Sequence, residues 1–404
     1  MQTYSELLAL ISKNQAVGPS HPDFHHIVLS LSPQSRASLA AKYSLSLNQV
    51  HRRLTFFFQT LGVVSLMDIT LTRQLALLAT ARELQVRLEQ PSLAIPLLVS
   101  SCPGFICFME KTHPTLLPHV SLIKSPMAIM GSFIKRKLAQ SRGIDPLKTY
   151  HVSVMPCYDK KLEGSREELM YLGQRETDLV LTTGEVEMLM TQKNMDIQML
   201  PESDLDIFTL MADDGQVLNN PGSTSGGYLQ FTLKYIAQQK YGLVLSDEEF
   251  TTGSERLLIE KGRNADSEDF VLVDPSTGQE LVRMAKCYGF RNIQNLVRRL
   301  SPKKNVRRRK DDDKVYHFVE VMACPSGCIN GGGQLKVAAQ ASSAAKEFLK
   351  ISENAYHSAL EKNWDKDDTV RQLWDAWGHD DVIKTTWRME EQKKDEPMNL
   401  SVNW

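Results

Sequence analysis

Four of the six cysteines in this 404-residue chain stand beside residues that interrupt regular backbone. Cys102 lies in "SCPGF", Cys157 lies in "MPCYDKK", and Cys324 and Cys328 lie together in "ACPSGC". Proline stiffens a turn and removes a competing backbone donor, while glycine lets the main chain approach closely. Thiols placed in this way indicate a chain shaped around a bound group that is larger than a single ion.

The compartment decides which chemistry is open to these thiols. The N-terminal stretch "MQTYSELLALISKNQ" predicts a short amphipathic helix and lacks the parts of a secretory signal. In a reducing compartment a disulfide framework is not expected, so metal binding, catalysis and core packing remain as explanations. Since a free cysteine commonly packs as a small hydrophobe, the case for chemistry depends on where the fold places each thiol.

The composition of the chain excludes few classes of protein, but it limits the kinds of partner that the chain is expected to bind. The hydrophobic content of 42% is ample for a buried core, and the length suits two lobes. The net charge of −1 gives no global field that would attract nucleic acid or an anionic membrane. No apolar run approaches the roughly 20 residues that a membrane helix needs. We therefore expect a protein of the cytosol or nucleus that binds neither nucleic acid nor membrane.

Short apolar runs that alternate with helical patterns predict an α/β fold with mainly parallel sheet. The predicted strands are "HIVLSLS" (26–32), "LGVVSLMDI" (61–69), "AIPLLVSS" (94–101), "YHVSVMP" (150–156), "TDLVLTT" (177–183) and "VYHFVEVMA" (315–323). Among the helical patterns, "SPMAIMGSFIKRKLAQS" has a capping residue, Ser125, followed by Pro126 in the first turn.

Three of these predicted strands deliver a thiol at their carboxyl ends. Cys102, Cys157 and Cys324 each follow a strand directly, and Cys328 comes one turn later. Ligands of open parallel sheets bind outside the carboxyl ends of the strands. The four thiols are therefore predicted to meet at one edge, which favours metal binding over packing.

The spacing favours a cluster over a single zinc ion. Structural zinc sites usually show two paired C-x2-C knuckles, whereas this chain has a single close pair with C-x3-C spacing. Four thiolates from three strand ends fit a buried [4Fe–4S] cluster, which is normally held by four cysteines. Lys160 and Lys161 follow Cys157 closely and are placed either to offset the thiolate charge or to form a solvated helix start.

Three motifs resemble those of iron-only hydrogenases: "SSCPGF", "MPCYDKKLE" and "VMACPSGCINGGGQ". The match is closer to their non-hydrogenase relatives, the hydrogenase-like (NARF-like) proteins of cytosolic iron–sulfur protein assembly. Further stretches such as "GSTSGGYL" and "CYGFRNIQNLV" are similar to that family, and the resemblance extends from about residue 5 to residue 340.

The resemblance implies a fold and a set of site residues. The fold is α/β and iron-only-hydrogenase-like, with two lobes of mainly parallel sheet, a cleft between them that holds the cluster, and a helical C-terminal tail. The implied cluster ligands are Cys102, Cys157, Cys324 and Cys328, and Lys160 matches the family lysine that contacts the binuclear subsite. Cys107 and Cys287 match no ligand position and are expected to be core thiols. The glycine run 331–333 is expected to let the backbone turn tightly beside the cluster.

The expected domains are residues 1–20 as an N-terminal helix left from a missing cluster module, 21–130 as the first lobe, 131–340 as the second lobe, and 341–404 as the helical tail. The second lobe includes the charged segment 301–314, read as a solvated loop, with a nuclear-localisation or nucleic-acid patch as the alternative.

Two departures from the family pattern bear on function. Ser101 stands where true hydrogenases carry a proton-donating cysteine, and a serine is a far poorer proton relay at neutral pH. We therefore expect a protein that is not an enzyme. In addition, no cysteine precedes Cys102, so the second, N-terminal [4Fe–4S] cluster of the assembly family is not expected here.

The implied function is to bind a [4Fe–4S] cluster and to link the early scaffold proteins to the late targeting complex that matures cytosolic and nuclear iron–sulfur proteins. The terminal Trp404 resembles the short C-terminal signals that the targeting complex recognises. The alternatives are a hydrogenase-type oxidoreductase, a zinc-binding interaction protein and a truncated, non-functional isoform. Sequence leaves open whether the cluster is structural, redox-active or in transit.

Overall fold

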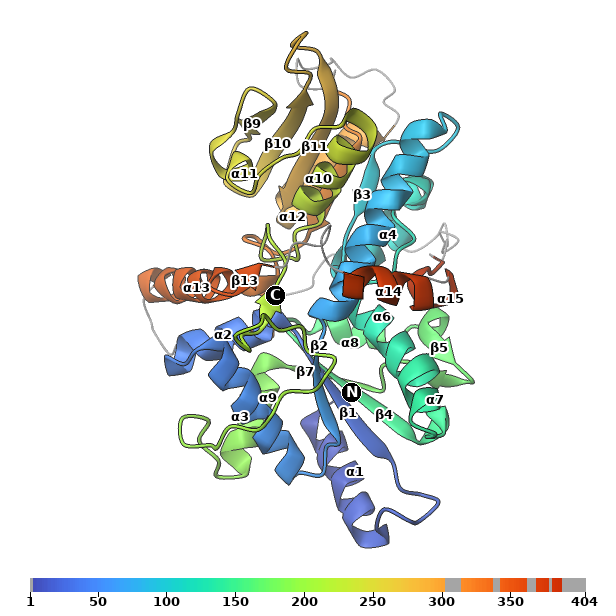
Figure 1. The fold of residues 1–404 in the computed structure, drawn as a ribbon, viewed down its shortest axis with the longest axis vertical. Helices are drawn as coiled ribbons and strands as arrows, with labels where there is room; N and C mark the ends of the chain where they lie inside the picture. Colours follow the sequence, from blue (N-terminus) through green and yellow to red (C-terminus); the bar gives the residue numbers. More distant parts are fainter. Residues whose placement is uncertain (1–2, 302–313, 337–341, 362–367, 378–379, 387–404) are drawn as a thin grey trace, which may run out of the picture.

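The computed structural model describes residues 3–301, 314–336, 342–361, 368–377 and 380–386. Two separate sheets with flanking helices make an α/β protein (Figure 1), which confirms the predicted fold class. Most of the charged segment 301–314 and the terminal Trp404 lie outside the described residues. Within the described part, no helix is both long enough and apolar enough to span a bilayer.

The first sheet is entirely parallel and has the order β2-β1-β4-β7. Its strands are β1 (His26–Leu31), β2 (Ser65–Asp68), β4 (Thr149–Met155) and β7 (Leu179–Thr182). Every residue of β2 and β7 is buried, as expected for a parallel sheet that is covered on both faces. All four strands were predicted from their apolar runs, with ends within four residues of the observed ones.

The second sheet is mixed and has the order β3-β12-β11-β10-β9. Its strands are β3 (Leu97–Val99), β9 (Leu257–Lys261), β10 (Ser267–Val273), β11 (Glu280–Tyr288) and β12 (Phe318–Met322). Strands β3, β12 and β11 run parallel, whereas β11, β10 and β9 are antiparallel. The antiparallel part was not predicted. It forms because the short segment between β10 and β11 can close a hairpin but is too short for a parallel crossover.

Each sheet takes strands from both sides of residue 130. The chain leaves the first sheet after β2, adds β3 to the second sheet, and returns to the first sheet with β4. The expected lobes 21–130 and 131–340 therefore differ from the two sheets. This crossing places the carboxyl ends of β3, β4 and β12 around the same part of the molecule (Figure 1).

Helices cover the faces of both sheets (Figure 1). In chain order the first ten are α1 (Tyr4–Val17), α2 (Pro33–Tyr43), α3 (Leu47–Thr60), α4 (Thr70–Glu89), α5 (Pro103–Thr112), α6 (Pro126–Phe133), α7 (Ala139–Ser141), α8 (Asp159–Gly164), α9 (Thr183–Gln192) and α10 (Tyr228–Tyr241). They continue with α11 (Glu249–Thr252), α12 (Phe290–Leu300), α13 (Ser342–His357), α14 (Asp368–Trp377) and α15 (Asp380–Ile383). Two small strand pairs join β5 (Met170–Tyr171) to β6 (Gln174–Arg175) and β8 (Leu218–Asn219) to β13 (Leu360–Glu361).

Helix starts follow local capping chemistry. The Ser125 hydroxyl accepts a hydrogen bond from the Ala128 amide with Pro126 in the first turn, as predicted. Ser46 opens α3 with a complete capping box that uses Gln49. The predicted helix 125–141 is interrupted by one π-helical turn, Ile134–Leu138, between α6 and α7.

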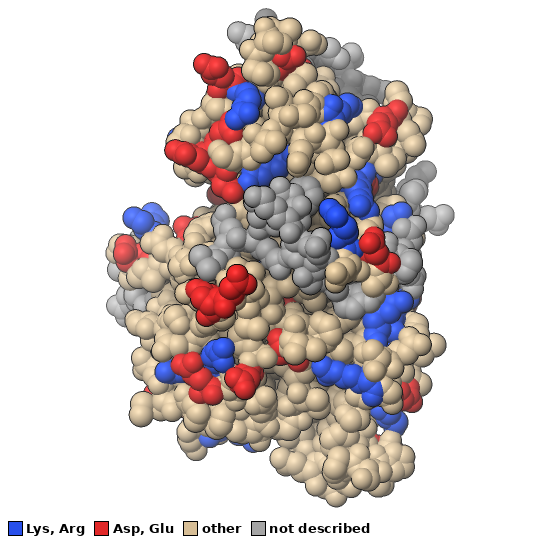
Figure 2. All heavy atoms as spheres, viewed as in Figure 1, with Lys and Arg blue, Asp and Glu red and all other residues tan. Residues whose placement is uncertain are grey.

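The C-terminal segment is mainly helical in its described parts and packs back on helices that flank the two larger sheets. Helix α13 lies against α2, and α14 contacts α4. Trp374 packs against the apolar core of the second sheet, with the Arg82 guanidinium 4.1 Å from its ring centroid. Trp374 is therefore a packing residue of this region. On the face drawn in Figure 2, basic and acidic side chains are interspersed, as a net charge of −1 suggests.

Two fully buried histidines, His51 on α3 and His151 on β4, make the protein sensitive to acid. Burial lowers the pKa of His51 to about 4 and the pKa of His151 to about 3. His151 Nε2 lies 2.8 Å from the Ser30 hydroxyl, and its Nδ1 lies 3.2 Å from the Glu176 carbonyl oxygen. Both rings are therefore neutral in the folded protein and protonate only when the chain unfolds.

We expect the free energy of unfolding to fall as the pH falls from about 6.5, because the unfolded histidines then bind protons that the folded ones do not. Urea titrations of iron-free protein at pH 7.0, about 6.2 and about 5.5 measure this slope above the range where unperturbed carboxylates titrate. Replacing His151 with glutamine removes one of these groups and should flatten the slope. A slope equal to that of the unsubstituted protein would contradict the assignment.

Candidate metal centre

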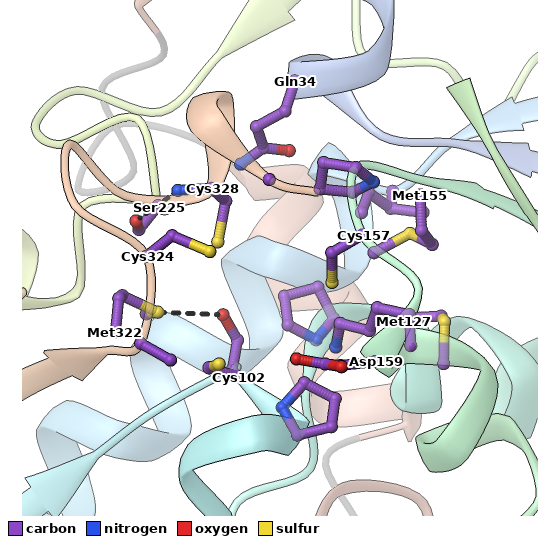
Figure 3. A pocket seen from close by; sticks show the side chains of 18 of the residues that line it. Gln34, Cys102, Met127, Met155, Cys157, Asp159, Ser225, Met322, Cys324 and Cys328 are labelled. Carbon is purple, nitrogen blue, oxygen red and sulfur yellow. Dashed lines mark hydrogen bonds between the residues drawn. The ribbon is translucent and has the colours of Figure 1, made fainter. Parts of the chain in front are cut away.

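Four cysteines line one cavity at the junction of the two lobes. The cavity has an empty volume of about 610 Å³, part of which is open to solvent, and its walls include Cys102, Cys157, Cys324 and Cys328. Figure 3 shows Cys157 pointing into this space from the wall opposite Cys324 and Cys328, with Cys102 below them. The structure thus brings together the four thiols that the strand ends predicted to meet.

Each thiol is held where a strand gives way to the next element. Cys102 is the residue before α5 and follows β3 by three positions. Cys157 lies between β4 and α8, and Cys324 comes two residues after β12. Cys328 is the first residue of a one-turn 3₁₀ helix, Cys328–Asn330. The cysteines of the cavity therefore come from the carboxyl ends of three strands that pair in parallel.

The glycine run 331–333 brings two cysteine segments close together. A Cβ atom on Gly331 would lie 2.3 Å from the Pro156 carbonyl oxygen, and one on Gly333 would lie 2.6 Å from the Thr182 side chain. None of the three has a positive φ angle. The expected tight turn is present, because the Gln334 amide donates to the Gly331 carbonyl at 3.0 Å, and the glycines also allow close approach of the Cys328 segment to the end of β4.

A second glycine-rich segment, 222–227, supports the Cys324–Cys328 loop from outside. The Cys328 amide donates to the Ser225 hydroxyl at 3.1 Å, and the Thr224 hydroxyl donates to the Ser326 carbonyl at 3.0 Å. Gly327 has a φ of +79°, and a Cβ atom there would lie 2.3 Å from the Ser225 oxygen. Both the conformation and the space at Gly327 therefore require glycine.

Burial makes all four thiols weak acids. It raises the pKa of Cys324 to about 12 and of Cys328 to about 11. Burial also raises the pKa of Cys102, and burial together with the adjacent Cys102 and Cys328 raises the pKa of Cys157. The metal-free cavity therefore holds neutral thiols at pH 7, and metal binding must displace their protons.

The four thiols are spread around the cavity rather than converging on one point. Among the described residues, no group of three or more His, Cys, Asp or Glu side chains is close enough to hold a single metal ion. The zinc knuckle considered from the sequence would require such a group. A donor set of soft thiols around a cavity of this size fits a multi-iron cluster, whose irons each bind a different cysteine.

Lys160 lines the cavity, as the sequence predicted, but its charge is already shared. Its Nζ lies 2.7 Å from a Glu163 carboxylate oxygen and donates to the Ser125 hydroxyl at 2.9 Å. Lys161 is not among the residues of the cavity wall, and its Nζ lies 2.7 Å from Glu185 on α9. Of the two predicted cations, only Lys160 therefore faces the thiols.

Ser101 lies between the cysteine cavity and a second cavity, and contributes to the wall of both. Its hydroxyl donates to the Met322 sulfur at 3.9 Å (Figure 3). An aliphatic hydroxyl beside a thioether is a poor proton relay, because the thioether is only a weak acceptor and cannot take up its proton.

The remaining cysteines stand apart from the cavity wall. Cys287 on β11 is buried in an apolar cluster with Val321 and Ile293, which confirms its expected core position. Cys107 on α5 was also expected to be a core thiol, but its side chain is only partly buried.

Sequence reasoning missed several polar residues of the cavity wall: Gln34, Arg73, Asp159 and Ser225. Gln34 reaches the cavity from α2, and Asp159 stands beside Cys157 at the start of α8 (Figure 3). Arg73 stands among polar residues in "TLTRQLALL", so nothing in the sequence signals its burial. The segment "GSTSGG" contributed to the resemblance but was not assigned to the site.

Comparison with known proteins gives a consistent result. The family described as iron only hydrogenase large subunit, C-terminal domain, matches residues 25–332. Cytosolic Fe-S cluster assembly factor narfl of Danio rerio is 39% identical over 93% of this chain and 87% of its own length. Cytosolic iron-sulfur assembly component 3 of Bos taurus is 37% identical over 93% of this chain and 75% of its own length. Protein NAR1 of Arabidopsis thaliana is 36% identical over 93% of this chain and 77% of its own length.

Solved structures with the same fold include hydrogenases. One [FeFe]-hydrogenase structure superposes with a TM-score of 0.77 at 22% sequence identity and covers 96% of this chain and 99% of its own. A variant of the apo [FeFe]-hydrogenase from Chlamydomonas reinhardtii gives a TM-score of 0.75 at 22% identity, with the same coverage. At 22% sequence identity, these superpositions show a shared fold and nothing more.

Proposed function

The chain belongs to the iron-only hydrogenase-like family and, within it, to the NARFL/NAR1 group of cytosolic iron–sulfur assembly factors, and we propose that it acts in cytosolic iron–sulfur cluster assembly by binding a [4Fe–4S] cluster. The proposed ligands are Cys102, Cys157, Cys324 and Cys328, with Lys160 in the adjoining wall. One observation carries the proposal: four thiols from three distant segments line a single cavity that is too wide to bring them to one ion.

The protein is proposed to be an assembly component rather than a hydrogenase. Its relatives are named as assembly factors, and Ser101 occupies the place where a hydrogenase needs an acidic thiol. The hydroxyl of a serine gives up its proton far less readily than a thiol at neutral pH. The shared fold keeps hydrogenase-type redox chemistry as the second candidate.

The proposed partners follow from the same role. We place the protein in the cytosol, with the nucleus as an additional location, between early scaffold proteins that build clusters and the late targeting complex that delivers them. Docking to the targeting complex is proposed to use Trp404, whose indole offers a large apolar surface for recognition.

Anaerobic purification followed by metal and acid-labile sulfide analysis tests the cluster directly. About four iron and four sulfide per chain are expected, with an electron paramagnetic resonance signal that appears on reduction. Hydrogen evolution with a strong reductant is expected to stay at background. Bound zinc without sulfide would overturn the cluster proposal, and measurable hydrogen turnover would favour the oxidoreductase.

A further inference from the structure

A buried arginine forms part of the cysteine cavity and has no carboxylate partner among the residues that the structure describes. Arg73 on α4 is 3% exposed and lies in the cavity wall. Its Nη1 donates to the Tyr356 hydroxyl at 3.1 Å, and its Nη2 donates to the Gln34 side-chain oxygen at 3.3 Å. Its Nε has no hydrogen-bond partner in the part of the chain that the structure describes. Both partners are neutral.

Burying a guanidinium without a counter-charge is costly. The penalty for removing an ion from water is large unless an opposite charge compensates it. Within the described ranges Arg73 forms no ion pair, whereas the buried Arg36 contacts Asp68 and the nearly buried Arg87 contacts Glu83 at 2.8 Å. These two arginines of comparable burial thus have carboxylates, and Arg73 faces the cysteines instead.

The cavity wall contains two cations, Arg73 and Lys160, and only one of them is paired with a carboxylate. The positive charge of Lys160 is offset by Glu163, 2.7 Å away. Gly226 adds to the contrast, because a Cβ atom there would lie 3.2 Å from Arg73 Nε, so glycine leaves room for the guanidinium. An anion in this cavity would thus meet one compensated cation and one uncompensated cation.

The group that holds Arg73 comes from the C-terminal part of the chain. Tyr356 lies on α13 and is 1% exposed, and α13 packs against α2, which carries Gln34. Gln34 also donates to the Thr224 carbonyl at 2.8 Å, in the segment that supports the Cys328 loop. Arg73 is therefore fixed between two elements that pack on each other beside the thiols.

We infer that Arg73 is the charge partner of the bound cluster, and that Tyr356 holds it at the cavity so that cluster binding and docking of α13 stabilise each other. This inference rests on the cluster proposed above. A cluster bound by four thiolates is anionic and gains a further negative charge on one-electron reduction, which a fixed guanidinium favours. Coupling is reciprocal: if the docked helix strengthens cluster binding, the cluster strengthens docking by the same factor.

Three variants and one matched control test the inference. Arg73→Gln removes the charge, Arg73→Lys keeps the charge but loses the planar fork, and Tyr356→Phe removes the hydroxyl that holds the guanidinium. Arg87→Gln is the control, because it alters a comparably buried arginine on the same helix that has its own carboxylate, Glu83. Each is loaded anaerobically as the full chain, and three quantities are measured: iron loss to a chelator, the midpoint potential, and amide hydrogen exchange of residues 342–357.

Arg73→Gln is expected to lose iron about 10–100-fold faster, the range typical of groups that support metal ligands. Its midpoint potential should become more negative, while Arg73→Lys should stay closer to the unsubstituted protein. Tyr356→Phe should shift both quantities in the same direction by less. In the unsubstituted protein the cluster should slow hydrogen exchange in α13, and this protection should shrink in Tyr356→Phe. The Arg87→Gln control should match the unsubstituted protein in iron loss and potential.

Unchanged iron loss and potential in Arg73→Gln would overturn the inference, and so would equal shifts in the Arg87→Gln control. If Arg73→Gln does not fold, Tyr356→Phe decides: iron loss and exchange equal to those of the unsubstituted protein overturn the inference. Failure of the proposed function is distinct, because the unsubstituted chain itself would then bind no iron and sulfide.

Discussion

Replacing Cys328 with alanine is expected to reduce bound iron to background, whereas replacing Cys107 with alanine leaves iron content unchanged. Cys328 lies in the cavity wall beside Gly327 and is fixed there by the Ser225 hydrogen bond, so no other thiol can take its place. Cys107 is five residues beyond Cys102 on α5 but is not part of the wall. Iron and sulfide analysis of anaerobically purified protein makes the measurement.

Urea unfolding separates loss of a ligand from loss of the fold. Iron-free Cys328→Ala should unfold much as the iron-free unsubstituted protein does, since a neutral thiol is exchanged for a small apolar side chain. Loaded with iron, only the unsubstituted protein should gain stability, because a ligand that binds the native state alone stabilises it. Equal iron losses in Cys107→Ala and Cys328→Ala would contradict the assignment.

The positions of the thiols could be predicted because each depends on local sequence. Apolar runs of strand length end directly before Cys102, Cys157 and Cys324, and parallel strands present their carboxyl ends at a common edge. The relation holds even though the chain crosses between two sheets, since β3 and β12 pair with each other while β4 belongs to the other sheet.

The antiparallel half of the second sheet could not be predicted from hydrophobic pattern. Its strands carry charges that compensate one another: the buried Arg283 on β11 lies 2.8 Å from the partly exposed Glu260 on β9 and 3.2 Å from the buried Asp269 on β10. Charged residues that pair across strands interrupt the alternation of apolar and polar residues from which a strand is predicted. Their partners become visible only when the strands are side by side.

The role of Arg73 could not be predicted for a related reason. Within "TLTRQLALL" an arginine fits the solvent face of a helix, and its burial depends on Tyr356, 283 residues later in the chain. Lys160 was easier to place because it stands three residues after Cys157, but its ion pair with Glu163 changes how much charge it offers to a ligand. The spacing from Cys157 therefore predicted the position of Lys160 but not its ion pair with Glu163.

Replacing Asp68 with alanine is expected to lower the free energy of unfolding by about 3–5 kcal/mol, the cost of leaving one buried charge without its partner. Asp68 and Arg36 are in direct contact, and each side chain is 1% exposed. Burial by itself would raise the pKa of Asp68, but the Arg36 charge and the Thr70 hydrogen bonds hold that pKa below its usual range, so the carboxylate is ionised. Urea unfolding at pH 7 measures the loss.

The same substitution should also disturb the cavity. Asp68 accepts hydrogen bonds from the Thr70 amide at 2.8 Å and hydroxyl at 2.7 Å, which fixes the start of α4. A carboxylate at a helix N-terminus is favoured by the helix dipole. Since α4 carries Arg73 and α2 carries Arg36, loss of Asp68 should loosen two walls of the cavity at once, and iron retention should fall together with stability.

A double variant distinguishes the charge from the shape of the site. In Arg36→Met with Asp68→Leu both charges are replaced by apolar groups, so no unpaired charge remains, and such exchanges are often neutral or stabilising. We expect the double variant to recover most of the stability that Asp68→Ala loses. If it is as unstable as Asp68→Ala, the loss comes from packing or from the Thr70 hydrogen bonds, because the double variant leaves neither charge of this pair behind.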